Sequence, residues 1–181
     1  MLVQNPQIVL FIPGQATELD ATRAIIREYA ASLGVDLCFQ DFEAELASLP
    51  GAYGEPRGAQ LLVTVGNALA GCCALRPLET NACEIKRLYV RPAFRGLGLG
   101  RQLAEAMLDC ARRAGYDCVL LDTLSEMEAA RALYQELGFE EVPPYHHNPL
   151  SGGTISKRSF DVLTVKLAFI AYKIRFDYEN Q

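Results

Sequence analysis

The chain has 181 residues, half of them apolar, and carries a formal net charge of −5. This length and composition suffice for one hydrophobic core, so we expect a single domain over residues 1–181. The acidic balance argues against a nucleic-acid partner, which would require concentrated Lys and Arg, and no apolar run is long enough to cross a membrane. The start of the chain has no cationic leader, and we therefore expect a cytoplasmic protein.

The cysteines and histidines predict neither a metal site nor disulfides. The six cysteines include no Cys-x-x-Cys pair and lie within apolar patterns, as small buried side chains do. The two histidines, His146 and His147, are adjacent, and this spacing does not supply the ligand set of a zinc site. We therefore expect no bound metal.

The first half of the chain is predicted to contain both strands and helices. Apolar residues recur with helical spacing after Thr17 or Asp20, either of which can cap a helix that ends at Leu33. Gly66 and Asn67 form a turn signal between two apolar runs and predict an antiparallel strand pair. The expected elements are a strand at 7–12, helices at 17–33 and 43–49, and strands at 61–65 and 70–75.

The second half is predicted to contain a strand–helix–strand crossover. A strand at 84–90 is followed by a helix at 102–114, which ends before Gly115. The next strand, at 118–124, is expected to run parallel to the strand at 84–90 because a helix connects the two. A helix at 126–137 and a strand at 139–142 come last before Pro143 and Pro144. The predicted class is α/β with a mixed sheet.

The most informative segment lies between the strand at 84–90 and the helix at 102–114, and it reads Arg95-Gly96-Leu97-Gly98-Leu99-Gly100-Arg101. Its alternate glycines let the backbone bend tightly and approach a ligand, and the first amides of the helix present free N–H groups to an anion. A phosphorylated ligand is therefore predicted. The segment lacks the Gly-Lys-Ser or Gly-Lys-Thr of a Walker loop. Leu103 replaces the third glycine of a dinucleotide turn, so a nicotinamide enzyme is the weaker alternative.

The glycine segment resembles motif A of the GNAT superfamily of acetyl-coenzyme A dependent N-acetyltransferases, in which Arg or Gln, two residues, Gly, one residue and Gly or Ala follow a strand. The run from Ala130 to Phe139, with Tyr134 before Gly138, resembles motif B of that family. The resemblance is best over residues 61–149. It implies the GNAT fold, which is a mixed, mostly antiparallel sheet with one splayed parallel strand pair and helices on both faces.

Residues 150–181 form an atypical tail in comparison with the family. The family's final strand usually follows soon after a loop such as Tyr145 to Pro149, but the segment 151–158 is polar here. The later runs at 160–167 and 169–176 have strand character, and either is predicted to supply the missing strand. The run at 168–176 also suits an edge partner for another subunit, which leaves a homodimer open.

The resemblance implies where acetyl-coenzyme A binds. The backbone of Leu88 and Val90 would bond the pantetheine arm as an added strand would, and an amide near Tyr89 or Val90 would polarise the acetyl carbonyl. Amides of the glycine segment would hold the pyrophosphate, and Arg95 or Arg101 would add charge. The segment residues concerned are Arg95, Gly96, Leu97, Gly98, Leu99, Gly100 and Arg101.

Two side chains are candidates for proton transfer. Glu84 lies six residues before Val90, and a glutamate at that offset is the general base in several family members; in the alternative interpretation it only pairs with Lys86 or Arg87. Tyr134 matches the motif B tyrosine, which donates its proton to the departing thiolate. An asparagine often found seven residues before that tyrosine is Met127 here.

The acceptor is predicted from charge on the strand at 84–90. Strict alternation would put Glu84, Lys86, Leu88 and Val90 on one face and Ile85, Arg87 and Tyr89 on the other, so that each face carries a cation. Buried cations need anionic partners, and Glu79, Asp122 or Glu84 of the protein could supply them. In the alternative hypothesis, Arg76, Lys86 or Arg87 binds a carboxylate of a small amino-acid-like acceptor. Tyr145 is a further candidate contact.

The leading hypothesis is therefore direct acetyl transfer from acetyl-coenzyme A to a primary amine of a small molecule. Two alternatives stay open: an acetyltransferase for protein lysines or N-termini, and a coenzyme A binding module without catalysis.

Overall fold

A computed structural model describes residues 6–34, 41–124, 127–143 and 153–159. The strands are β1 (Ile8–Phe11), β2 (Ala59–Val65), β3 (Ala68–Pro77), β4 (Ala82–Val90), β5 (Cys118–Leu124), β6 (Glu140–Val142) and β7 (Gly153–Ser159). The helices are α1 (Ala16–Leu33), α2 (Phe42–Ala47), α3 (Leu99–Arg113) and α4 (Glu128–Glu136), with 3₁₀ turns η2 (Gly51–Tyr53) and η3 (Pro92–Phe94).

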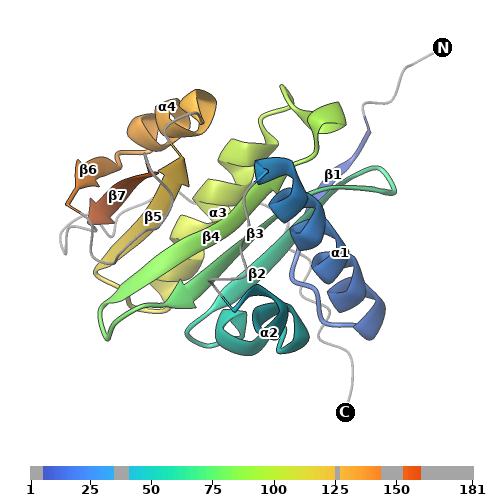
Figure 1. Ribbon diagram of the computed structural model, residues 1–181, viewed down its shortest axis with the longest axis horizontal. Helices are drawn as coiled ribbons and strands as arrows, with labels where there is room; N and C mark the ends of the chain where they lie inside the picture. The colour runs from blue at the N-terminus through green and yellow to red at the C-terminus, as the bar shows by residue number, and fades with distance from the viewer. Residues whose placement is uncertain (1–5, 35–40, 125–126, 144–152, 160–181) are drawn as a thin grey trace.

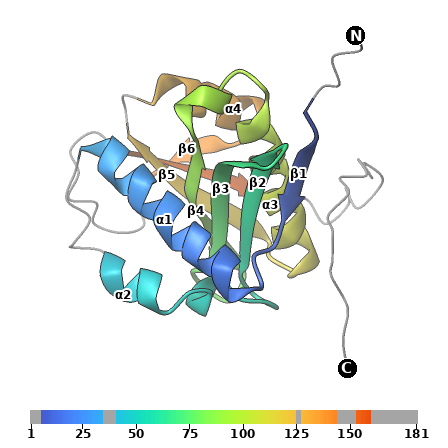
Figure 2. The same ribbon diagram turned by 90° about the vertical axis from the view of Figure 1, so that its right-hand side faces the viewer.

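The strands form one sheet in the order β1-β2-β3-β4-β5-β7-β6. All neighbours are antiparallel except β4 and β5, which are parallel and joined through α3. Helices α1 and α2 cover one face of the sheet and α3 covers the other, as Figure 1 and Figure 2 show. The predicted mixed sheet with one parallel pair and helices on both faces is confirmed.

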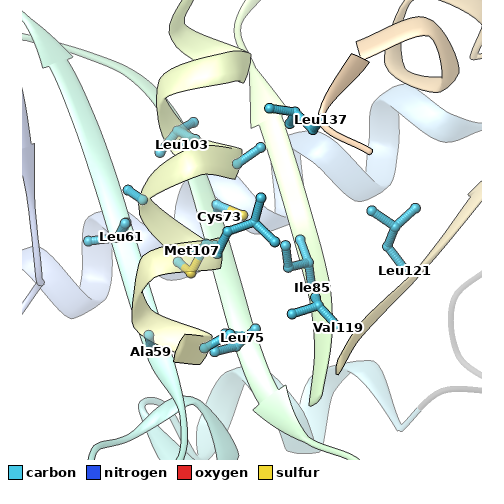
Figure 3. Close-up of a cluster of buried hydrophobic side chains, with 14 of the residues drawn as sticks. Ala59, Leu61, Cys73, Leu75, Ile85, Leu103, Met107, Val119, Leu121 and Leu137 are labelled. Atoms are coloured by element: carbon cyan, nitrogen blue, oxygen red, sulfur yellow. The ribbon is translucent and has the colours of Figure 1, made fainter. Parts of the chain in front are cut away.

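The larger core lies between the sheet and α3 (Figure 3). Leu99, Leu103 and Met107 recur every four residues along α3 and are almost fully buried. They pack on odd-numbered residues of β2, such as Leu61, because alternate side chains of a strand point to the same face. Burial of each such side chain contributes about 1.5–3 kcal/mol, so this face fixes α3 and the glycine segment before it against the sheet.

A second core lies on the opposite face and joins α1 and α2 to the sheet. Ile25 and Ile26 of α1 and Leu46 of α2 are buried there against Leu62 and Cys72. This packing brings the polar side chains of α1 and α2 next to those of β4, which decides how the candidate site is built.

The start of α1 differs from the prediction. The helix begins at Ala16 with Gln15 as its N-cap, so neither Thr17 nor Asp20 caps it. The Glu18 carboxylate instead accepts hydrogen bonds from the backbone N–H groups of Gly14 at 2.8 Å and Gln15 at 3.0 Å. A carboxylate in the first turn satisfies these donors and is favoured by the helix dipole.

Strict alternation along β4 was a wrong expectation, because the strand contains a β-bulge. Ala74 pairs with Lys86 while Cys72 pairs with Tyr89, so β4 has one more residue than β3 between these pairs. Arg87 is the extra residue, and its φ is +58°. As a result Leu88 packs on the α3 side, and Lys86, Arg87 and Tyr89 share the face towards α1 and α2. The two cations therefore lie on one face rather than on both.

The strand that completes the sheet was also misplaced by the sequence prediction. It is β7, at Gly153–Ser159, and it lies between β5 and β6 with antiparallel bonds to both. Its sequence is mostly polar, so hydropathy gives no strand signal, and backbone pairing on both sides holds it in place. The runs 160–167 and 169–176, which were expected to supply this strand, lie outside the described residues.

Candidate active site

Strands β4 and β5 separate halfway along their length. Their parallel pairing extends from Ala82 with Cys118 to Ile85 with Leu121 and ends there. Beyond that point β4 continues to Val90 bonded to β3 on its other side, while β5 continues bonded to β7. Among the described residues, the β4 edge at 86–90 thus has no partner strand, and such an edge can accept an extended ligand by strand addition. Leu88, Tyr89 and Val90 lie in this stretch.

The glycine segment follows β4 and η3 directly and leads into α3. Gly96 and Gly98 have φ +83° and +73°, which residues with a Cβ rarely adopt, and Gly98 is the N-cap of α3. The side chains of Arg95 and Leu97 are exposed, and Leu99 is buried in the larger core. The first amides of α3 have no intrahelical acceptor and carry the positive end of the helix dipole, so this loop can hold a phosphate group.

The two arginines of the segment already have partners within the protein. Arg95 Nε donates to the backbone carbonyl of Val90 at 3.2 Å. Arg101 donates to the Glu136 carboxylate of α4 and lies 3.8 Å from Glu105. The backbone amides are therefore the part of this cradle that is available without rearrangement, and Arg101 links the start of α3 to the end of α4.

Tyr134 is the buried residue of α4 and points into the larger core. Its ring packs edge-on against Phe139 with centroids 5.5 Å apart. Burial raises the pKa of Tyr134, so the phenol stays protonated at physiological pH. Gly138 ends α4 with φ +80°, and a Cβ at this position would collide with the Arg158 guanidinium. The Leu-Gly-Phe part of the motif thus fixes the ring that Tyr134 packs against.

Glu84 is buried on the α1 and α2 face, with its side chain 3% exposed. Arg76 Nε donates to Glu84 Oε2 at 2.9 Å, and Arg76 Nη2 lies 2.8 Å from the same oxygen. Lys86 Nζ lies 4.0 Å from Glu84 Oε1. Arg76 faces Glu84 directly across β3 and β4, which explains the pair. Of the two partners considered from sequence, Lys86 is near Glu84, and Arg87 pairs elsewhere.

Arg87 forms a buried ion pair with Glu45 of α2, a residue that no sequence pattern singled out. Arg87 Nε and Nη2 donate to Glu45 at 2.9 and 2.7 Å, and Tyr53 Oη donates to Glu45 at 2.8 Å. Burial alone would raise the pKa of Glu45, but the hydrogen bonds and charge of Arg87 lower it overall. The Arg87 guanidinium is thus committed to a protein carboxylate.

Lys86 differs from the two arginines because its nearest ion-pair partner among the described residues, Glu84, is 4.0 Å away. Burial lowers the pKa of Lys86, since the ammonium loses hydration. Lys86 pairs with Ala74, which pairs with Gln60, so these residues form one row across the sheet on the same face. Both polar atoms of the Gln60 side chain are buried and have no hydrogen-bond partner within the described part of the chain. A glutamine within an apolar strand can be recognised from the sequence, but its position in the same row as Lys86 cannot.

A second polar cluster lies at the end of β4. Glu28 of α1 accepts hydrogen bonds from Tyr89 Oη at 3.1 Å and from Arg91 Nε at 2.9 Å. The ring of Tyr29 lies 5.4 Å from that of Tyr89. Arg91 also donates to the Leu69 carbonyl at 2.8 Å. These contacts fix the end of the unpaired β4 stretch against α1.

Tyr145 lies outside the described residues. Within the described part of the chain, no group of three His, Cys, Asp or Glu side chains is arranged to bind a metal ion. No described helix is both long and apolar enough to span a membrane.

Comparison with known proteins identifies the relatives of this chain. Residues 22–139 match the model of the Acetyltransferase (GNAT) family. An uncharacterized N-acetyltransferase of Schizosaccharomyces pombe is 39% identical over 135 residues, which cover 74% of this chain and 83% of that protein. Human N-acetylaspartate synthetase is 32% identical over 114 residues, covering 62% of this chain but 38% of the synthetase.

Solved structures share the same fold. An acetyltransferase from Streptococcus agalactiae superimposes with a TM-score of 0.71 over 84% of this chain and 98% of its own, at 18% identity. An acetyltransferase from Salmonella typhimurium solved with acetyl-CoA gives a TM-score of 0.63 over 87% of this chain and 96% of its own, at 21% identity. The split between β4 and β5 and the glycine segment therefore occur within a fold that other acetyltransferases adopt.

Proposed function

This chain belongs to the GNAT family of N-acetyltransferases, and we propose that it moves an acetyl group from acetyl-coenzyme A to the primary amine of a small, amino-acid-like molecule. The observation that carries the proposal is the unpaired β4 edge at residues 86–90, which leads directly into the glycine segment and α3. An extended pantetheine arm and a pyrophosphate are the two chemical features that such a neighbourhood would recognise.

The donor would bind mainly through backbone groups. Leu88 and Val90 would bond the pantetheine arm, and the amides from Gly96 to Arg101 would hold the pyrophosphate. An amide near Tyr89 would polarise the thioester carbonyl, as an oxyanion hole does. The acetyl-CoA-bound Salmonella structure with the same fold supports this choice of donor.

Glu84 would be the general base in this reaction. The amine must lose a proton to attack the thioester carbonyl, and the carboxylate would take that proton directly or through a water molecule. Arg76 binds one oxygen of Glu84 at two points and fixes the orientation of the carboxylate. The attack forms the C–N bond as the C–S bond breaks, and coenzyme A leaves as a thiolate.

Tyr134 would donate the proton, or a hydrogen bond, that stabilises the leaving thiolate. Its protonated state at physiological pH, secured by burial, supports this role. Because the pKa of Tyr134 is raised, the phenol is a weak acid, and its main contribution would be a hydrogen bond that strengthens as negative charge develops on sulfur.

Lys86 would bind a carboxylate of the acceptor. Arg76 and Arg87 are occupied by Glu84 and Glu45, whereas Lys86 has its nearest partner at 4.0 Å and a pKa lowered by burial. A carboxylate beside the ammonium would compensate for this lost hydration. The N-acetylaspartate synthetases among its relatives are named for an acetylated amino acid as product, which supports an acceptor of this kind.

The acceptor assignment is tested with amino acids and their carboxamides, which differ only in the carboxylate. Thiol release from acetyl-coenzyme A is measured for each pair with the wild-type chain and with Lys86→Met. We expect the wild-type chain to prefer the amino acids by about tenfold or more, as one charge-assisted hydrogen bond would provide, and Lys86→Met to lose this preference. Acetylation of the carboxamides alone would contradict the assignment.

A further inference from the structure

The bulge residue of β4 has a conformation that its surroundings must enforce. Arg87 has φ +58°, a left-handed conformation that is disfavoured for residues with a Cβ. It is the extra residue of β4 at the bulge. On one side of the bulge Lys86 pairs with Ala74, and on the other side Tyr89 pairs with Cys72. Such a residue relaxes towards ordinary strand geometry unless other contacts hold it.

Contacts from α2 and η2 hold Arg87 in place. Its side chain is 4% exposed, and it donates two hydrogen bonds to Glu45, which is 13% exposed. Tyr53 Oη donates to the same carboxylate, and the Arg87 guanidinium lies 5.2 Å from the ring centroid of Phe42. The Arg87 carbonyl accepts a hydrogen bond from Cys72 Sγ at 3.3 Å. Neighbours outside β4 thus fix both the side chain and the backbone carbonyl of Arg87.

The bulge lies at the point where its geometry matters for the donor. It follows the last β4–β5 pair, between Ile85 and Leu121, and precedes the stretch of Leu88, Tyr89 and Val90. Because of the bulge, Leu88 packs on the α3 side and Tyr89 on the α1 side. Without it, every residue from 88 onwards would be turned to the other face of the sheet. The direction of the backbone groups at 88–90 therefore depends on Arg87.

We propose that Glu45 and Arg87 are positioning residues for acetyl transfer, and that their ion pair holds the β4 bulge so that the backbone of residues 88–90 faces the pantetheine arm and the thioester. This inference rests on the proposed function. It assigns to α2 a part in donor binding, through the contact of Glu45 with the Arg87 side chain.

The test compares coenzyme A binding, measured by calorimetry, and kcat/KM for acetyl-coenzyme A in four chains. Glu45→Gln keeps the size of the side chain and removes its charge. The double variant Glu45→Gln, Arg87→Gly also removes the guanidinium, but glycine adopts the left-handed conformation without strain. Leu10→Ala, at the far edge of the sheet in β1, is the control for lost stability without any change near the bulge. All are assayed at a temperature at which circular dichroism shows them folded.

We expect Glu45→Gln to weaken coenzyme A binding and to lower kcat/KM, each by about tenfold, and the double variant to regain at least half of the loss on a logarithmic scale. Leu10→Ala should keep wild-type values in both assays. Wild-type values for Glu45→Gln, or a double variant that binds coenzyme A no better than Glu45→Gln, would overturn the positioning role. A wild-type chain that binds no coenzyme A would overturn the proposed function and this inference together.

Discussion

Replacement of Glu84 by Gln separates proton transfer from ion pairing, because the amide has the volume of the carboxylate but cannot accept the proton of the amine. Removal of one partner of a buried ion pair costs about 3–5 kcal/mol. Arg76, however, is 36% exposed and regains water when its partner is lost, so we expect a stability cost of about 1–2 kcal/mol. General base catalysis contributes about 10²–10⁴-fold to rate. The kcat of Glu84→Gln should therefore fall by at least about a hundredfold while the chain stays folded.

The matched control for this prediction is Arg76→Met, which breaks the same ion pair but keeps the carboxylate. Both variants are measured by thiol release at saturating acetyl-coenzyme A and by urea denaturation. Arg76→Met should lose at least as much stability, because the buried Glu84 carboxylate loses its closest cation, but its kcat should fall by less than about tenfold, because the base is retained. Equal loss of kcat in the two variants would show that Glu84 acts only as a structural ion-pair partner, and the reasoning would be refuted.

Three further outcomes are expected. Tyr134→Phe should lower kcat by about tenfold or more and change the affinity for coenzyme A by less than about threefold, since the hydrogen bond to sulfur forms in the transition state; equal kcat would contradict this. Gly98→Ala should weaken coenzyme A binding in calorimetry and destabilise the chain by about 1 kcal/mol, because of the left-handed N-cap; unchanged binding would argue against the cradle. Glu45 has a lowered pKa in the folded state, so the unfolded chain takes up the proton first, and wild-type stability should fall as the pH drops below the usual value of 4.5. Urea denaturation between pH 3 and 7 should show a smaller fall in the free energy of unfolding for Glu45→Gln than for the wild-type chain. Parallel plots of this free energy against pH would contradict the lowered pKa of Glu45.

Local patterns predicted most of the fold because the helices and central strands are amphipathic. The helix predicted at 102–114 and the turn predicted at Gly66-Asn67 each reflect a local rule, and both elements are present, although α3 begins earlier, at Leu99. Strand β7 escaped prediction because its side chains are polar and its place depends on backbone pairing with distant strands. The N-cap of α1 was misassigned because a glutamate three residues further on satisfies the free amides.

The same distinction between local patterns and distant contacts applies to the candidate site. The glycine segment and Tyr134 could be selected from sequence, since their chemistry depends on contiguous motifs. The bulge at Arg87 could not, because one extra residue in a strand leaves no mark on hydropathy, yet it reverses the faces of all residues after it. Glu45 was missed because its partner is 42 residues away along the chain.

Transfer of an acetyl group from acetyl-coenzyme A to a small amine is the activity that we propose for this chain. Its most direct test is to measure the released coenzyme A thiol and the acetylated amine, by mass spectrometry, in the same reaction with an amino acid as acceptor. We predict equal amounts of the two products, with rates that rise with amine concentration and fall by at least about a hundredfold in Glu84→Gln. Binding of coenzyme A without amine-dependent thiol release from any member of a broad amine panel would contradict the account and identify a binding module instead.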